Sequence, residues 1–244
     1  FACTVRAQSA APVAVSKADA LATELREVAE AYRVEHGIVG MSIAVIDDGA
    51  VIADVALGSR DREAKLAVES ATLFRLASVS KPVTATAIMQ LVDAKKLALD
   101  SDVHGYVRDL EPKLGALTLR RILSHTSGLR HYRIDRVDGG TLHRSTSEAL
   151  ELFVHDELLF EPGTKYSYST HAFTLAHACV ESASGLAFPE YIHARIAKGV
   201  APSLACEVAS EREPARSAPY TKTAVGVVLR SEPREDLSWK YGGG

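Results

Sequence analysis

Phe74-Arg75-Leu76-Ala77-Ser78-Val79-Ser80-Lys81-Pro82 is the most informative stretch of this chain, because it ends where a long apolar helical pattern begins. Ser78 and Lys81 stand three residues apart, and on a helix such residues share one face with Cβ atoms about 5 to 6 Å apart. A serine hydroxyl alone is a weak nucleophile, and a neighbouring unprotonated amine can take its proton. The spacing therefore predicts a serine nucleophile beside a lysine base, as covalent acyl transfer requires.

The same spacing has a purely structural explanation, because serine often caps a helix and a lysine three residues later often faces solvent. The flanking sequence favours the chemical interpretation. Pro82 opens a helical pattern of buried type, whose apolar positions are Val83, Ala87, Ile88, Leu91 and Val92. We therefore expect Ser78 and Lys81 at a strand-to-helix junction inside the core, where burial disfavours a charged amine and favours a base.

The composition indicates a globular protein with a sizeable core. The chain has 244 residues, of which 47% are hydrophobic and 24% charged, and its formal net charge is -3. That balance lacks the basic excess of nucleic-acid-binding proteins, and no apolar run reaches the roughly 18 residues of a membrane span. The cysteines Cys3, Cys179 and Cys206 form no metal-binding or redox pair, and a bridge between Cys179 and Cys206 stays open as an alternative.

Periodicity along the chain predicts an α+β protein. The Asp48-Gly49 step between two apolar runs indicates a β-hairpin over 40–57. Helical spacing predicts helices at 17–36, 78–96, 118–123, 145–158, 172–184 and 188–196, followed by a strand at 224–229. Asp100 and Asp102 are expected to cap or terminate helices rather than to form a catalytic carboxylate pair. The order of helix, hairpin, helical block and late strand is typical of α+β architecture.

Several segments resemble, in their order along the chain, the motifs of one superfamily. After residues 74–81 come Leu97 to Tyr106, the turn His125-Thr126-Ser127-Gly128-Leu129, Glu161-Pro162-Gly163-Thr164 and Tyr168-Ser169-Thr170. Together they make about residues 30–244 similar to the serine β-lactamases and penicillin-binding proteins, particularly the class C β-lactamase and esterase-like branch with its lactamase-like serine peptidases. The resemblance implies a β-lactamase/transpeptidase-like fold, in which an antiparallel sheet with flanking helices adjoins a helical block.

The resemblance also implies roles for four residues. Ser78 corresponds to the nucleophile, and Lys81 and Tyr168 correspond to the groups that share general-base and general-acid duties. Which of these two takes the first proton stays open. Thr170 stands at a substrate-binding position where the family has asparagine, and its hydroxyl lacks the paired donor and acceptor of an amide. We therefore expect peptides or esters rather than β-lactam amides, and we expect no metal and no organic cofactor.

The third family motif, a lysine or histidine followed by threonine or serine and glycine, has no full counterpart. Lys222-Thr223-Ala224 lacks the glycine. We therefore expect a single domain over 17–244 whose C-terminal strands are missing. Its parts are an N-terminal sheet part at 17–77, a helical part at 78–199 and an incomplete return to the sheet at 200–244. Residues 1–16 are expected to be a leader remnant or a disordered spacer, with a lipid anchor at Cys3 as an alternative.

The sequence thus predicts an exported, periplasmic or extracellular serine hydrolase. It would act through a covalent acyl-enzyme on β-lactams, D-alanyl peptides or small esters, with an activity that the missing motif weakens. The alternative is a non-catalytic penicillin-binding or sensor domain that is acylated without turnover or does not react. The expected partner is a small-molecule or peptide substrate, and not a nucleic acid.

The histidines have simpler explanations than catalysis or metal binding. His125 and Ser127 share one tight turn and are expected to serve turn chemistry rather than to form a Ser/His pair. His171 and His177 are expected in a loop and in a helix, because their spacing matches no compact ligand cluster.

Overall fold

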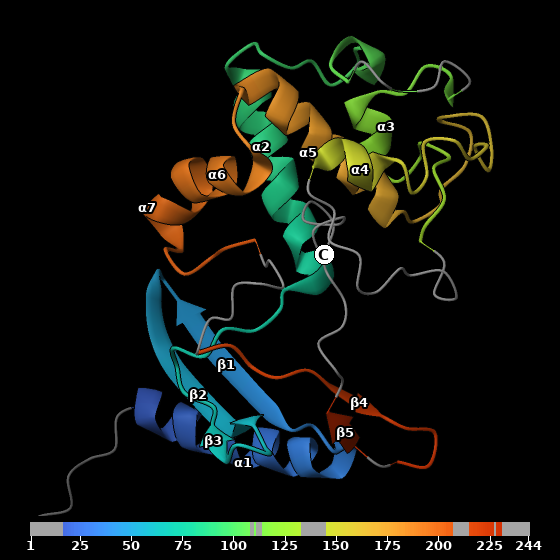
Figure 1. The fold of residues 1–244 in the computed structure, drawn as a ribbon. Helices are drawn as coiled ribbons and strands as arrows, with labels where there is room; N and C mark the ends of the chain where they lie inside the picture. The colour runs from blue at the N-terminus through green and yellow to red at the C-terminus, as the bar shows by residue number, and fades with distance from the viewer. Residues whose placement is uncertain are drawn as a thin grey trace, which may run out of the picture. The chain divides into compact units, whose positions relative to one another are not determined.

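The computed structural model describes residues 17–107, 110, 114–132, 145–206, 215–226 and 228–230, and the chain divides into two compact units. One unit is formed by residues 1–73 and 215–231, and the other by residues 74–214 and 232–244. Figure 1 shows the strands in the first unit and most of the helices in the second. The leader or spacer predicted at 1–16 lies outside the described residues, and the prediction of a single domain stays a prediction.

The first unit pairs a helix with a three-stranded antiparallel sheet. Helix α1 (Lys17–His36) precedes strands β1 (Gly40–Asp47), β2 (Ala50–Asp61) and β3 (Leu66–Ala67), which lie in the order β1-β2-β3. The turn residues Asp48 and Gly49 have φ values of 47° and 77°, as the tight turn predicted from the Asp-Gly step requires. Helix α1 packs on β2, and its Ala29 shares a small core with Val55 and Leu57. The predicted helix at 17–36 and hairpin at 40–57 are confirmed.

A second hairpin in this unit corrects one prediction. Strands β4 (Tyr220–Lys222) and β5 (Val228–Arg230) pair antiparallel, so the strand predicted at 224–229 is wrong in its first half. That part forms a turn, in which the Gly226 N–H donates to the Thr223 carbonyl at 2.9 Å. Gly226 has φ +84°, which glycine adopts without a Cβ clash.

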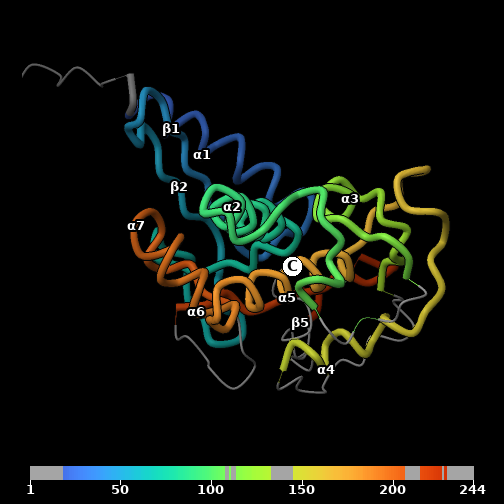
Figure 2. Tube along the Cα trace, turned by 90° about the horizontal axis from the view of Figure 1, so that it is seen from above, coloured from blue at the N-terminus to red at the C-terminus, as the bar shows by residue number. Residues whose placement is uncertain are grey.

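The second unit is built around helix α5 (Thr170–Ser184), in which every residue from Thr170 to Val180 is buried. The helices that pack against α5 are α2 (Ser80–Asp93), α3 (Leu119–Leu123), α4 (Thr146–Leu150) and α6 (Phe188–Ile192). Figure 2 shows α2 and α5 from above. The described part of this unit also contains 3-10 turns at Ala77–Val79 and Val103–Gly105, a π-helical turn at His193–Ala197, and α7 (Lys198–Val200). None of the helices in the described ranges has the length and hydropathy of a membrane span.

Helix α4 ends at Leu150 and is therefore shorter than the helix predicted at 145–158. The chain after it is held by Arg130, whose guanidinium donates to the Leu152 carbonyl at 2.9 Å and pairs with the Asp156 carboxylate. The Leu152 carbonyl therefore accepts from a side chain rather than from the N–H of a continued helix. This contact joins segments distant in the sequence, so local periodicity could not reveal it.

Cys179 and Cys206 are both free thiols, so the bridge that the sequence left open is not formed. Burial raises the pKa of each thiol to about 12. Both side chains are therefore protonated and weakly reactive at neutral pH.

Asp102 caps a 3-10 turn, as expected, whereas Asp100 forms an ion pair with the Arg120 side chain. The Asp102 carboxylate accepts from the His104 N–H at 3.0 Å and thereby caps the 3-10 turn that follows it. The Asp100 carboxylate accepts from two nitrogens of Arg120, at 2.6 and 2.8 Å.

The turn at 125–129 depends on Gly128, and substitution of this glycine should lower the free energy of unfolding of the helical unit. Gly128 has φ +79°, and an added Cβ would lie 2.4 Å from the Phe160 carbonyl oxygen. Gly115, with φ +65° and open space around it, provides the matched control. In urea unfolding followed by circular dichroism, Gly115→Ala should cost about 1–2 kcal/mol, the usual penalty of the left-handed region. Gly128→Ala should cost clearly more, and equal losses would contradict the tight contact with Phe160.

Candidate active site

Ser78 lies at the start of the helical segment that continues into α2. It belongs to the 3-10 turn Ala77–Val79 and is exposed. The residue before it, Ala77, has φ +46°. A residue with a Cβ is uncommon in this left-handed region, and such backbone strain tends to cluster at functional sites. The turn thus presents the Ser78 hydroxyl at the N-terminal end of a long helix.

Lys81 is buried directly behind Ser78. Its side chain is only 5% exposed, and its Nζ donates to Ser78 Oγ at 3.1 Å and to Thr170 Oγ1 at 3.3 Å. The Nζ atom also lies 4.7 Å from the ring centre of Tyr168 and 5.5 Å from that of Phe173, within the range of cation–π attraction. The amine extends from α2 and is therefore held beside the serine by contacts with Thr170 and Phe173 of α5.

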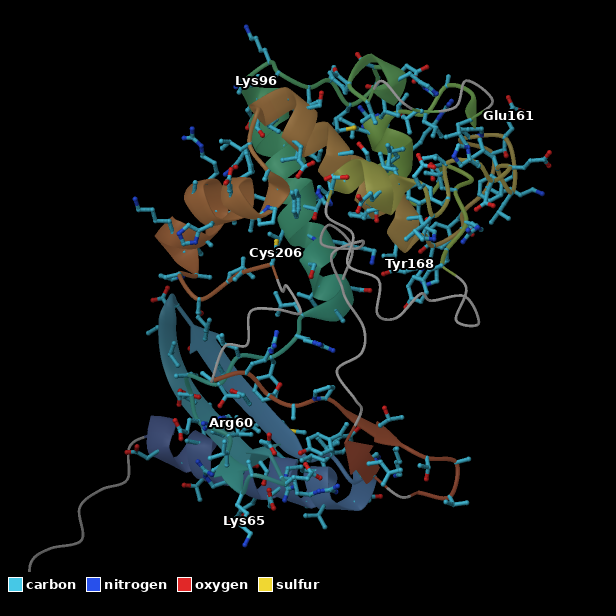
Figure 3. All side chains as sticks on the ribbon, in the orientation of Figure 1. Arg60, Lys65, Lys96, Glu161, Tyr168 and Cys206 are labelled. Carbon is cyan, nitrogen blue, oxygen red and sulfur yellow. The ribbon has the colours of Figure 1, made fainter. Side chains whose placement is uncertain are left out.

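Tyr168 approaches the same serine from the start of α5. Its hydroxyl donates to Ser78 Oγ at 2.8 Å, and Figure 3 shows its side chain where the chain enters that helix. Burial raises the pKa of the Tyr168 phenol, but its hydrogen bonds with Lys81 and Ser78 and the charge of Lys81 outweigh burial, so the pKa lies below its usual value. The lowered pKa makes the phenol a stronger proton donor than a free tyrosine and increases the fraction present as phenolate at a given pH.

Thr170 is the first residue of α5 and is 2% exposed. Its hydroxyl accepts from Lys81 Nζ, which places it beside the amine. The role in substrate binding that the resemblance implies for Thr170 stays a prediction, whereas the contact with Lys81 is observed.

Two histidines join this site through contacts that the sequence did not predict. His125 has φ +58°, as part of the expected turn, but its Nδ1 also accepts from the Ser169 N–H at 3.2 Å. The Nδ1 atom of His131 accepts from the Thr170 N–H at 3.1 Å. No local sequence pattern indicates these two histidine contacts, because each joins segments that are distant along the chain.

Other residues weighed in the sequence lie elsewhere. Lys222 belongs to the other unit, where its Nζ donates to the His36 carbonyl at 3.2 Å. His171 lies in α5 rather than in the expected loop, and burial, followed by the charges of Arg130 and His131, lowers its pKa to about 3. His177 lies in the same helix, as expected. Within the described residues, no three His, Cys, Asp or Glu side chains gather as a metal site requires.

The fold identifies the class of protein. Among solved structures, the chain is similar to the penicillin-binding protein from Bacillus halodurans, with a TM-score of 0.71, 27% identity, and coverage of 82% of this chain and 62% of that chain. The chain is thus a β-lactamase/transpeptidase-like α+β protein. It belongs to the Beta-lactamase family, whose family model matches residues 19–235. The predicted fold class and the resemblance to the serine β-lactamase and penicillin-binding protein superfamily are confirmed.

Curated relatives include hydrolases of several kinds. Esterase EstB of Burkholderia gladioli is 32% identical over 209 residues, which cover 79% of this chain and 53% of the esterase. The human mitochondrial serine beta-lactamase-like protein LACTB is 27% identical, over 90% of this chain and 52% of that protein. The chain spans about half the length of these two relatives. Further relatives are named penicillin-binding protein and D-aminopeptidase, so the family context is that of acyl-transfer hydrolases.

Proposed function

We propose that this protein is a serine hydrolase that acts through a covalent acyl-enzyme formed on Ser78. One observation carries the proposal: the exposed Ser78 Oγ lies 3.1 Å from Lys81 Nζ and 2.8 Å from Tyr168 Oη. A hydroxyl held between an amine and a phenol has two groups that can exchange its proton, which is the requirement for an activated nucleophile.

In the proposed first step, Ser78 Oγ attacks the carbonyl carbon of the substrate. The serine proton passes to the unprotonated Lys81 amine or to the Tyr168 phenolate, and the carbonyl π electrons move onto oxygen. When the tetrahedral intermediate collapses, the bond to the leaving group breaks, and that group takes a proton from the Lys81 and Tyr168 pair. Water then attacks the acyl-enzyme, with the same pair as base, and releases the acid and the free serine.

The developing oxyanion would be stabilised at the N-terminal end of the segment that enters α2. A helix N-terminus presents backbone N–H groups and a partial positive charge. We assign one donor to the Ser78 backbone N–H, as the resemblance implies. A donor of this type commonly contributes about 10² to 10³ in rate.

The proposed substrates are small esters, D-alanyl peptides and β-lactams. The names of the relatives, an esterase, a D-aminopeptidase and a penicillin-binding protein, support this range. Thr170 favours esters and peptides within the range, because its hydroxyl cannot reproduce the paired contacts of an asparagine amide. Action outside the cytoplasm remains part of the proposal.

Intact-mass spectrometry with a fluorophosphonate and with a labelled penicillin tests the proposal. The fluorophosphonate should add one covalent group that peptide mapping assigns to Ser78, and an activated ester should be turned over. A penicillin adduct that persists without turnover would instead favour the acylated sensor. Absence of any adduct and of any hydrolysis, with the protein folded by circular dichroism, would contradict the proposed function.

A further inference from the structure

The N-terminus of α5 is capped by two imidazole rings in addition to an ordinary cap. The Ser169 hydroxyl accepts from the Ala172 N–H at 3.0 Å, as N-cap serines do. His125 Nδ1 accepts from the Ser169 N–H at 3.2 Å, and His131 Nδ1 accepts from the Thr170 N–H at 3.1 Å. The histidines therefore hold the two backbone N–H groups that follow Tyr168 directly.

The same rings pack on the Tyr168 side chain. The ring centre of His125 lies 4.4 Å from that of Tyr168, with the planes tilted by 34°. The ring of His131 lies 5.5 Å away at 71°, an edge-to-face contact. Tyr168 is 37% exposed, and these two rings are among the groups that pack on its side chain. Backbone and side chain are thus fixed by the same pair of residues.

These contacts require His125 to be neutral. An Nδ1 that accepts a hydrogen bond carries no proton, so the ring proton lies on Nε2. Burial, followed by the charges of Lys81 and His131, lowers the pKa of His125. The groups that face it are Lys81 of α2, His131, the tyrosines Tyr166 and Tyr168, and the Phe173 ring of α5. Protonation would place a proton on the accepting nitrogen and a second cation near Lys81.

We propose that His125, together with His131, is a positioning residue that holds Tyr168 in place for its contact with Ser78. The protonation of His125 thereby sets part of the acid limb of the pH profile, the fall in activity at low pH. This inference rests on the proposed function. The uncharged ring holds the Tyr168 backbone and phenol in place, and its protonation releases the Ser169 N–H and loosens the phenol. Activity therefore falls as the pH drops through the pKa of His125.

Two substitutions of His125 distinguish its role as a hydrogen-bond acceptor from the effect of its protonation. Glycine adopts φ +58° without strain, so His125→Gly removes the ring and the Nδ1 acceptor while the backbone can keep its conformation. Asparagine also tolerates this region, and its carbonyl oxygen can accept the Ser169 N–H without titrating. His155→Ala is the control, because His155 is exposed and contacts Glu151, four residues earlier in the chain.

The measurements are kcat and KM for an activated ester between pH 4 and 9. His125→Gly should lower kcat about 10- to 100-fold, the low end of a misplaced acid–base group, and should change KM little. His125→Asn keeps an acceptor for the Ser169 N–H and should stay within about 5-fold of the unsubstituted protein. Its acid limb should shift to lower pH, since the titrating imidazole is gone. His155→Ala should change neither quantity.

A double-mutant cycle with Tyr168→Phe tests whether His125 acts through Tyr168. In the Tyr168→Phe protein, the further loss from His125→Gly should shrink to about 3-fold or less, because coupled residues are not additive. The proposal is overturned if the two losses multiply, or if His125→Asn keeps the original acid limb. If His125→Gly does not fold, the position of the acid limb in the pH profile of His125→Asn alone decides whether the proposal holds. Failure of the proposed function is distinct, since the unsubstituted protein would then form no Ser78 adduct.

Discussion

Ser78→Ala is expected to remove all covalent labelling by the fluorophosphonate and to lower ester turnover by at least about 10⁴-fold, as loss of a serine nucleophile does in other hydrolases. The reason is geometric. Lys81 Nζ and Tyr168 Oη both lie within hydrogen-bond distance of this one oxygen. An alanine leaves the amine and the phenol in place without an atom that can attack a carbonyl.

Ser80→Ala is the matched control, because Ser80 stands between Ser78 and Lys81 in the motif and opens α2. It should label and turn over ester at close to the original rate. The readouts are intact mass after labelling, kcat/KM for the ester, and the urea midpoint, which should change little in either variant because Ser78 is exposed. Retained labelling in Ser78→Ala would mean that another residue is the nucleophile and would contradict the assignment of Ser78.

The part of the site that the sequence predicts is local. Ser78 and Lys81 are three residues apart, so helix geometry alone brings them together. The Asp48-Gly49 turn is local as well, because two residues determine its backbone. The approach of Tyr168 to Ser78 is not local, and only the resemblance of ordered motifs, not any periodicity, pointed to it. Its hydrogen bond of 2.8 Å with Ser78 agrees with that expectation.

Several features that sequence reasoning missed depend on tertiary contacts. His125 and His131 bond to backbone N–H groups about 40 positions away, and no spacing rule links such positions. Beyond the end of α4, the Leu152 carbonyl accepts from Arg130, which comes from a different segment. The left-handed backbone of Ala77 leaves no trace in the sequence, since alanine normally favours helices.

The site combines two helix starts that come from separate parts of the chain. Ser78 and Lys81 lie at the start of the segment that forms α2, and Tyr168 and Thr170 lie at the start of α5. Because these two helices pack against each other, the core that stabilises the helical unit also sets the distance between the serine and the phenol. A relative shift of the helices would therefore alter the proton-transfer geometry before it unfolded the unit.

Lys81→Met is expected to lower the rate of Ser78 acylation by about 10² to 10⁴-fold, the usual contribution of a positioned base. Stability should change little. The side chain is 5% exposed and lies against the rings of Tyr168 and Phe173. Methionine fills a similar volume and packs well on aromatic rings, so the apolar contacts of the side chain should be kept.

The same variant should also raise the pKa of the Tyr168 phenol. The hydrogen bond and the charge of Lys81 are two of the causes that hold this pKa below its usual value. When they are removed, the effect of burial on the pKa is less opposed, so the phenol should ionise at higher pH. An ultraviolet titration measures this ionisation, and Tyr168→Phe identifies the part of the signal that comes from Tyr168. Lys96→Met, which changes an exposed lysine of the same unit, should alter neither the acylation rate nor the titration. Loss of activity accompanied by an equal loss of stability, with the phenol titration unchanged, would mean that Lys81 supports the core and not the chemistry.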